Sequence, residues 1–190
     1  MATTALLLVD LQNGTCGPGQ AERRPEFDRL FHERTLPQVQ RALGLCRGAG
    51  VEVIHTVIEN LTADGRDRSR DYKRCGMGFP PGSWEAQVIE PLAPLAGEIV
   101  LPKSSSSPFS STILDYLLRN LGIDELLVAG ILTDQCIDHT VKDAADRGYR
   151  VTCLSDACMA ESLERHAMAL QCFSGYGRQL EVAAWAQELG

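Results

Sequence analysis

The sequence predicts an α/β fold, a single-domain three-layer α/β/α sandwich around a mostly parallel, doubly wound sheet of six strands. Its 190 residues suit one domain, 1–190, since domains commonly span roughly 100–200 residues. Hydrophobic residues make up 44% of the chain and charged residues 23%, which excludes disordered and fibrous classes. Short apolar runs alternate with amphipathic stretches, and this alternation is typical of parallel strands joined by crossover helices.

The predicted strands are short runs rich in valine, isoleucine and leucine. Nearly continuous apolar runs of this length are typical of parallel strands that are buried on both faces. The first five strands are predicted at 5–9, 51–58, 98–101, 126–131 and 150–154. A sixth, short strand is predicted near 180–182.

Between these strands, apolar residues recur at helical spacing. Gly50 follows the first stripe at a position suited to a C-terminal cap. Thr133 or Asp134 is expected to cap the start of the third. The predicted helical stripes span 36–46, 113–121, 137–145 and 163–170.

Two polar segments, 11–33 and 59–83, are predicted to be long loops. Both follow strands and are rich in glycine, proline and charge. Loops of this length inside a compact domain are usually functional. In a doubly wound sheet, ligands bind at the carboxyl ends of the strands, so we expect both loops to border a binding site there.

Charge and cysteine content limit the possible partners and location. A net charge of −7 argues against nucleic acid, which requires a basic surface. No apolar run approaches the roughly 20 residues that span a bilayer, and residues 5–9 are too short for the core of a secretory signal. Seven cysteines without a C-x-x-C pair are typical of thiols in a reducing compartment. We therefore expect no membrane partner and a cytoplasmic location.

Three residues with useful chemistry each follow a different predicted strand: Asp10, Lys103 and Cys136. Taken singly, Asp10 also fits a turn cap, Lys103 a solvated surface and Cys136 a core position. Together they supply a thiol, a base for its proton and a cation for its charge. Cys136 begins a predicted helix, where free N–H groups and the helix dipole favour a thiolate. No histidine lies in a comparable position, which argues against a Cys-His pair.

Several segments in a fixed order carry a family resemblance. They are Val-Asp-Leu-Gln-Asn at 9–13, Lys-Ser-Ser at 103–105 with Phe109 and Thr112, Gly-Ile-Leu-Thr-Asp-Gln-Cys at 130–136, Asp-Ala at 143–144, Gly-Tyr at 148–149 and Asp-Ala at 156–157. In this combination the sequence resembles the isochorismatase-like cysteine hydrolases over nearly its whole length.

The resemblance implies a catalytic Asp-Lys-Cys triad. Asp10 would be the general base, Lys103 would hold its carboxylate and favour the thiolate, and Cys136 would be the nucleophile. The resemblance also implies a cis peptide bond between Ile131 and Leu132, and an oxyanion hole formed by the backbone N–H groups of Leu132 and Cys136. The implied reaction is hydrolysis of a C–N amide bond through a cysteine thioester.

Within the family, the sequence looks most like the metal-free amidase branch. In that branch it resembles the hydrolases of ureidoacrylate, biuret and N-carbamoyl amides. True isochorismatases cleave a vinyl ether without a cysteine nucleophile, whereas this chain has Cys136. His55 is followed by no other histidine until His139, so no metal ligand set is expected. We expect no cofactor, and a small amide or ureide as substrate. Vinyl-ether and cyclic amide (lactam) hydrolysis stay open as alternatives.

The segment 59–73 looks most like the ureide-hydrolysing members. In this interpretation Asn60 hydrogen-bonds a urea group and Arg70 pairs with a substrate carboxylate. Tyr72 and Phe109 would form walls of the pocket. The alternative is that this mixed-charge segment is a solvated loop with internal ion pairs.

Two further expectations concern partners and a competing class. By analogy with the family, the chain is expected to form a homo-oligomer, a dimer or tetramer. A receiver-like signalling domain also combines an aspartate and a lysine at a sheet edge. Here, however, Leu11 rather than a second acid follows Asp10, and Lys103 stands where the phosphorylated aspartate would be. The sequence therefore favours the hydrolase.

Overall fold

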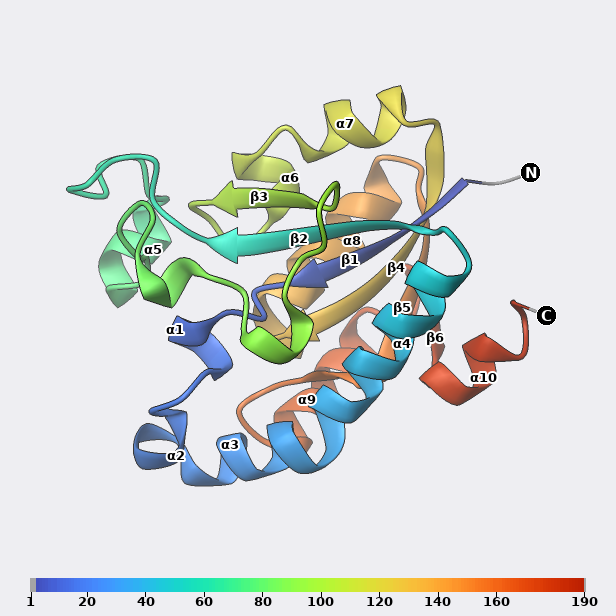
Figure 1. Cartoon of the computed structure of the whole chain (residues 1–190), viewed down its shortest axis with the longest axis horizontal. Helices are drawn as coiled ribbons and strands as arrows, with labels where there is room; N and C mark the ends of the chain where they lie inside the picture. Colours follow the sequence, from blue (N-terminus) through green and yellow to red (C-terminus); the bar gives the residue numbers. More distant parts are fainter. Residues whose placement is uncertain (1–2, 190) are drawn as a thin grey trace.

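The computed structural model describes residues 3–189 and contains one six-stranded sheet (Figure 1). The strand order is β3-β2-β1-β4-β5-β6, and every pairing between these strands is parallel. The predicted α/β class and the six strands are confirmed, and the sheet is wholly rather than mostly parallel. The strands are β1 (Thr3–Val9), β2 (Glu52–Ile58), β3 (Ile99–Lys103), β4 (Ile123–Ile131), β5 (Arg150–Met159) and β6 (Arg178–Leu180).

Helices cover both faces of the sheet and enclose two apolar cores. Alternate side chains of a strand point to opposite faces, so Leu6 and Leu8 of β1 enter one core and Leu7 and Val9 enter the other. The first core packs against α4 (Leu36–Gly48) and α10 (Val182–Ala186). The second core packs against α6 (Pro108–Ser111), α7 (Leu114–Asn120), α8 (Asp138–Asp146) and α9 (Leu163–Cys172).

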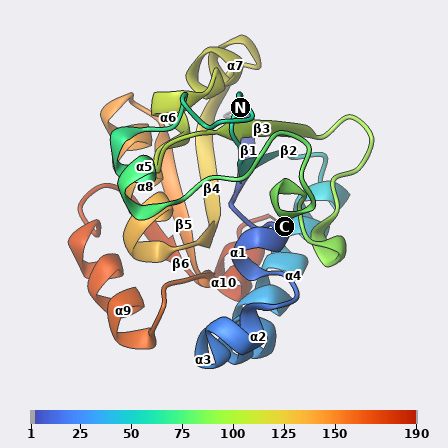
Figure 2. The same ribbon diagram turned by 90° about the vertical axis from the view of Figure 1, so that its left-hand side faces the viewer.

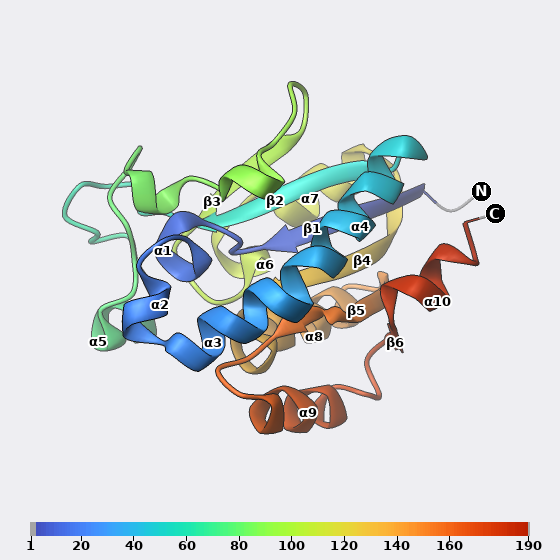
Figure 3. The same cartoon turned by 60° about the horizontal axis from the view of Figure 1, so that its bottom comes forward.

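The segment 11–33, predicted to be a loop, is mostly helical, so that prediction is wrong. Phe27, Leu30 and Phe31 recur at helical spacing and are buried in the first core. The helical segment that contains them leads directly into α4 (Figure 3). The dense charges around these residues obscured the stripe. The segment forms α1 (Asn13–Cys16), α2 (Gln20–Arg23), α3 (Pro25–Leu30) and the start of the π-helical turn η1 (Phe31–Thr35).

The segment 59–83 is largely irregular, as predicted, with one short helix, α5 (Arg70–Cys75). The side chain of Ser69 accepts a hydrogen bond from Tyr72 N (3.1 Å) and so caps the start of this helix. Gly76, with φ of 72°, ends it. After this segment come two single 3-10 turns, η2 (Trp84–Ala86) and η3 (Glu90–Leu92).

The last two strands differ from their predicted bounds. β5 continues to Met159 through a shift in its register with β4 between Val128 and Gly130. The sequence did not predict this extension because it contains polar residues. One of them, Asp156, is accommodated there because its carboxylate accepts a hydrogen bond from Val182 N at 2.8 Å. That bond also starts α10 at Val182, so β6 ends at Leu180.

The carboxyl ends of the strands lie at one side of the molecule, together with α1, α5 and the turn that follows β4 (Figures 1 and 2). The two segments predicted to border a site are therefore both on the expected side of the sheet. Among residues 3–189, no helix has the length and apolar character needed to cross a bilayer.

Candidate active site

Asp10 leaves the end of β1 with an unusual backbone conformation. Its φ is 60°, a left-handed value that is uncommon outside glycine. Hydrogen bonds hold it there: Asp10 N donates to Thr56 O (2.9 Å), and Thr15 Oγ1 donates to Asp10 O (2.5 Å). Gln12 joins β1 to β2, since its side chain accepts from Ile58 N (2.6 Å) and donates to Ile58 O (3.0 Å). The carboxylate is thereby turned inward at the sheet edge, where it is 1% exposed.

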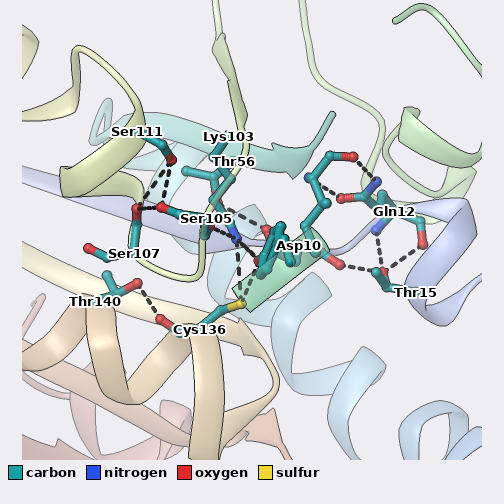
Figure 4. Close-up of polar contacts among 12 residues, drawn as sticks. Asp10, Gln12, Thr15, Thr56, Lys103, Ser105, Ser107, Ser111, Cys136 and Thr140 are labelled. Carbon is teal, nitrogen blue, oxygen red and sulfur yellow. Dashed lines mark hydrogen bonds and ion pairs between the residues drawn. The ribbon is translucent and has the colours of Figure 1, made fainter. Parts of the chain in front are cut away.

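Lys103 ends β3 and reaches across β2 to the same place. Its ammonium lies 2.9 Å from Asp10 Oδ2 and 3.4 Å from Cys136 Sγ (Figure 4). It also donates to Ser105 O at 2.9 Å. The serine-rich turn after β3 is closed by Ser105 Oγ, which lies within hydrogen-bonding distance of Ser107 O (3.0 Å) and of Ser111 Oγ (2.9 Å). This turn therefore supplies a fixed carbonyl to the lysine.

Cys136 lies in η4 (Thr133–Ile137), the π-helical turn between β4 and α8. Near the end of β4, Gly130 adopts a φ of 132°, a value that favours glycine. It also packs tightly on β1, since a Cβ at this position would lie 2.2 Å from Val9 O. The peptide bond between Ile131 and Leu132 is cis. Thr140 Oγ1 donates to Cys136 O at 2.5 Å and ties the turn to α8.

The predicted cap at Thr133 or Asp134 is wrong. Leu132 occupies the cap position of η4, without a side-chain hydrogen bond. Thr133 Oγ1 instead lies 2.8 Å from His166 Nδ1, and Asp134 accepts from Arg165 Nε at 2.6 Å. Both side chains anchor the turn to α9 instead.

Burial dominates the electrostatics of the three groups. It raises the pKa of Asp10 above its usual range, although the charge of Lys103 opposes this. Burial alone would lower the pKa of Lys103, but the combined effect of Asp10 and then of Cys136 and Tyr72 outweighs burial, and the pKa is raised. For Cys136, burial and then Asp10 raise the pKa to about 12, against the opposing effect of Lys103. The expected lowering of this thiol's pKa is therefore wrong, and Cys136 is a thiol at neutral pH.

A cavity of about 610 Å³ opens beside Asp10 and Cys136. A volume in this range suits a small organic ligand. Leu132 and Tyr72 also line it, so the residues of the predicted oxyanion hole and one predicted wall residue face the same space. Lys103 lies behind the cavity wall and is 1% exposed.

Three of the predicted substrate-binding residues are not among the residues that line this cavity: Asn60, Arg70 and Phe109. Asn60 is buried, and its backbone N–H donates to Phe79 O at 2.8 Å. Arg70 is exposed. Phe109 packs against Tyr149, with ring centroids 5.9 Å apart, in the second core. These placements depend on how the chain folds over itself, which residue type does not reveal.

Among the charged residues of the cavity that the sequence did not single out are Arg23 and Arg24 from the α2 region, Glu161 after β5, and the pair Asp71 and Arg74 of α5. Arg24 Nη1 pairs with Glu161 at 2.5 Å, whereas no ion pair of Arg23 is found within residues 3–189. Arg23 and Arg24 belong to the segment 11–33, where charge obscured the helices. The signal in the sequence that could have pointed to these arginines was the prediction that the segment 11–33 borders the site.

Tyr72 contacts Lys103 and Cys136 directly, which the sequence did not predict. Its Oη lies 3.0 Å from Lys103 Nζ and 3.6 Å from Cys136 Sγ. Its side chain is buried, and burial raises its pKa above the usual range, so the phenol keeps its proton. This residue is a neighbour of the sulfur as well as a wall of the cavity.

Across residues 3–189 no group of three or more His, Cys, Asp or Glu side chains is placed to hold a metal ion. His55 is buried in β2, with Nε2 3.2 Å from Glu98 Oε2. Glu98 also pairs with Arg47 at 2.7 Å. His139 lines the cavity, on α8.

Comparison with known proteins decides the family. Residues 4–187 match the isochorismatase domain. This chain belongs to the isochorismatase family. It is therefore an isochorismatase-family hydrolase, and the arrangement of Asp10, Lys103 and Cys136 is consistent with a catalytic triad.

Among its relatives, the ureidoacrylate amidohydrolase RutB of Methylobacterium radiotolerans is 31% identical, with 100% of this chain and 80% of the relative covered. An isochorismatase family protein from Desulfovibrio vulgaris has a similar structure, with a TM-score of 0.86 and 29% identity, covering 100% of this chain and 99% of that one. The N-carbamoylsarcosine amidase of Thermoplasma acidophilum gives a TM-score of 0.78 and 26% identity, covering 95% and 96% of the two chains.

Proposed function

We propose that this family member is a cysteine amidohydrolase that cleaves a C–N bond of a small carbamoyl or ureido compound. One observation carries the proposal: Lys103 Nζ lies 2.9 Å from the Asp10 carboxylate and 3.4 Å from the Cys136 sulfur, at the wall of a cavity of small-molecule size. Two similar proteins, ureidoacrylate amidohydrolase and N-carbamoylsarcosine amidase, bear names of amide-cleaving enzymes and support the same reaction class.

In the proposed reaction, Asp10 accepts the proton of the Cys136 thiol. Burial raises the pKa of the Asp10 carboxyl, which makes its carboxylate a better base at neutral pH. Lys103 stays protonated throughout and offsets the negative charge, which passes from Asp10 to the sulfur. The backbone N–H groups of Leu132 and Cys136 are the predicted donors to the carbonyl oxygen.

The remaining steps return the site to its starting state. The thiolate forms a C–S bond to the carbonyl carbon, and the C–N bond breaks as Asp10 gives its proton to the leaving nitrogen. Water then attacks the thioester, Asp10 accepts a proton from that water, and the sulfur leaves. The proton returns to Cys136, and the products are an amine and a carboxylic or carbamic acid.

One arginine of the cavity has no ion pair within residues 3–189 and suits a substrate with an anionic end, since the cavity's other two arginines, Arg24 and Arg74, are paired with acidic side chains. Arg24 is already paired with Glu161 at 2.5 Å, whereas Arg23 lines the same cavity and is exposed. A guanidinium recognises a carboxylate through two parallel hydrogen bonds. We therefore assign to Arg23 the role that the sequence suggested for Arg70.

The test is release of ammonia or amine from a panel of ureides, N-carbamoyl amino acids, biuret, nicotinamide and simple amides. We expect turnover of at least one carboxylate-bearing ureide, and loss of that turnover in Cys136→Ala. An enzyme that is inert toward the whole panel but cleaves an isochorismate-like ether, with or without Cys136, would contradict the proposal. Opening of a lactam that needs Cys136 would preserve the nucleophile and overturn the substrate class.

A further inference from the structure

We propose that Tyr72 is a catalytic residue whose phenolic O–H donates a hydrogen bond to the sulfur of Cys136 and stabilises the thiolate. This assignment deepens the proposed cysteine-hydrolase function and rests on it. Tyr72 comes from α5, outside the sheet edge that carries Asp10, Lys103 and Cys136. The sequence predicted it only as a wall of the pocket.

The hydrogen bonds of Lys103 provide the first argument. An ammonium group has three N–H donors and no acceptor. Lys103 Nζ donates to Ser105 O at 2.9 Å, to Tyr72 Oη at 3.0 Å and to Cys136 Sγ at 3.4 Å. It also forms an ion pair with Asp10 Oδ2 at 2.9 Å. Its three protons are therefore already used, so a second hydrogen bond to the sulfur has to come from another group.

The direction of the Tyr72 hydrogen bonds provides the second argument. Because Lys103 can only donate, Tyr72 Oη accepts from it, and the proton of the phenol is free to point elsewhere. Cys136 Sγ lies 3.6 Å from that oxygen. Burial raises the pKa of Tyr72, which keeps the proton on the phenol. The same contact lowers the pKa of Cys136, against the larger effect of burial.

This donor acts twice in the reaction and keeps its proton both times. It stabilises the negative charge on sulfur after Asp10 has taken the thiol proton. It does so again when the thioester breaks and the sulfur leaves as a thiolate. Hydrogen bonds to charged groups are stronger than bonds to neutral ones, so the contact favours the thiolate over the thiol and the thioester.

The surroundings of α5 hold this hydroxyl in place before any substrate binds. Ser69 caps the helix and its backbone N–H donates to Ser104 O, next to Lys103, at 2.8 Å. Met77 N donates to Tyr72 O at 2.9 Å. The tyrosine is therefore joined through the backbone to the turn that follows β3.

The test is the rate at which iodoacetamide alkylates Cys136, from about pH 7 to about pH 10, in the wild type and in Tyr72→Phe. Mass spectrometry of the peptide that contains Cys136 separates it from the other six cysteines. We expect alkylation to slow by about tenfold in the variant at each pH, which corresponds to a rise of about one unit in the pKa of the thiol. With a substrate in hand, kcat should fall by a similar factor while KM changes by less than about twofold.

Tyr116→Phe is the matched control, because Tyr116 is 68% exposed on α7, and neither its alkylation profile nor its kcat should change. Superimposable profiles for Tyr72→Phe and the wild type, or faster alkylation in the variant, would overturn the proposal. Slower alkylation in an enzyme that hydrolyses no amide would support the role of Tyr72 and contradict the proposed function instead. A rise in KM alone, with an unchanged alkylation profile, would return Tyr72 to a wall residue.

Discussion

The edge of the sheet and the segment 59–83 contribute to the same site in different ways. At the sheet edge, Asp10, Lys103 and Cys136 come from three elements, yet Lys103 Nζ lies 2.9 Å from the carboxylate and 3.4 Å from the sulfur. The segment 59–83 brings Tyr72 to the sulfur, whereas Arg70, two positions earlier, is exposed. Parallel strands place the residues at their ends predictably, whereas a loop places each residue through its own contacts.

The contacts that hold the two regions differ accordingly. The sheet edge is held by strand pairing and two apolar cores. The segment 59–83 is held mainly by hydrogen bonds: Asp67 accepts from Leu61 N (2.9 Å) and Thr62 N (3.1 Å), and Arg68 Nη1 donates to Met77 O (3.0 Å). Substitutions at the sheet edge should therefore lower activity or the free energy of unfolding more than substitutions in this segment do.

The largest expected effect is loss of activity in Cys136→Ala. Removal of the nucleophile should lower kcat/KM by at least about a thousandfold, measured by product release from the substrate that the panel identifies. Cys172→Ala is the control, because Cys172 is exposed on α9 and its loss should leave activity unchanged. More than about a tenth of wild-type activity in Cys136→Ala would mean that another group starts the reaction.

The next effect is on stability, in Lys103→Met. This change leaves Asp10 buried without its cation, and breaking a buried pair in this way costs about 3–5 kcal/mol, which urea unfolding at neutral pH would measure. Burial already raises the pKa of folded Asp10, and loss of Lys103 raises it further. Between the pKa of Asp10 in the unfolded chain and its raised pKa in the folded variant, the folded variant binds more protons than the unfolded chain. Its stability therefore falls as pH rises through this range, and the stability lost relative to the wild type should shrink toward about pH 4.

Lys142→Met is the matched control. Lys142 pairs with Asp138 at 2.7 Å on the surface of α8, so its removal should cost no more than about 1 kcal/mol. If the two lysine variants lost similar stability, or if the loss in Lys103→Met grew as pH fell, the electrostatic account of the sheet edge would be wrong.

The residues at the ends of the strands could be predicted from the sequence better than those in the loops. Asp10, Lys103 and Cys136 were predictable because each follows an apolar run, and a parallel sheet gathers such ends at one edge. Tyr72 contacts the sulfur and Phe109 belongs to the second core, yet both were predicted as pocket walls, since an aromatic residue in a loop suits either position. The helices within 11–33 were missed because charged residues surround the apolar stripe at Phe27. The pKa of Cys136 was misjudged because burial and then Asp10 raise it.

Two glycines compare the regions directly. A Cβ at Gly130 would lie 2.2 Å from the backbone oxygen of Val9, whereas at Gly78 it would lie 2.5 Å from side-chain atoms of Asn60 and Arg68. Both have positive φ, 132° and 137°, so alanine is strained at either position. The backbone of a paired central strand has less freedom to shift than the end of a side chain. Gly130→Ala should therefore lower the free energy of unfolding by about 3 kcal/mol and Gly78→Ala by about 1–2 kcal/mol, measured by urea unfolding.

Gly44→Ala is the control for this pair. Gly44 lies in α4, and among residues 3–189 no atom from outside its own helix comes within 4 Å of the position that a Cβ would take. Alanine there should therefore stabilise the chain by up to about 1 kcal/mol. Equal losses at Gly78 and Gly130 would remove the distinction between the two regions.

The smallest expected effect concerns substrate binding. Arg23→Ala should raise KM for a carboxylate-bearing ureide by about three- to tenfold with kcat nearly unchanged, since an exposed guanidinium contributes modestly to pairing. Arg70→Ala is the comparison, because Arg70 is exposed and does not line the cavity, and its KM should stay at the wild-type value. The opposite ranking would restore the carboxylate-binding role predicted for Arg70.

The central claim is that Cys136, activated by Asp10 and Lys103, carries the acyl group during turnover. Acid quenching during steady-state turnover, followed by mass spectrometry of the peptide that contains Cys136, tests it most directly. We predict that a fraction of this peptide gains the mass of the substrate's acyl or carbamoyl group, and that Cys172 gains none. Turnover that continues with Cys136 unmodified, and that persists in Cys136→Ala, would contradict the account.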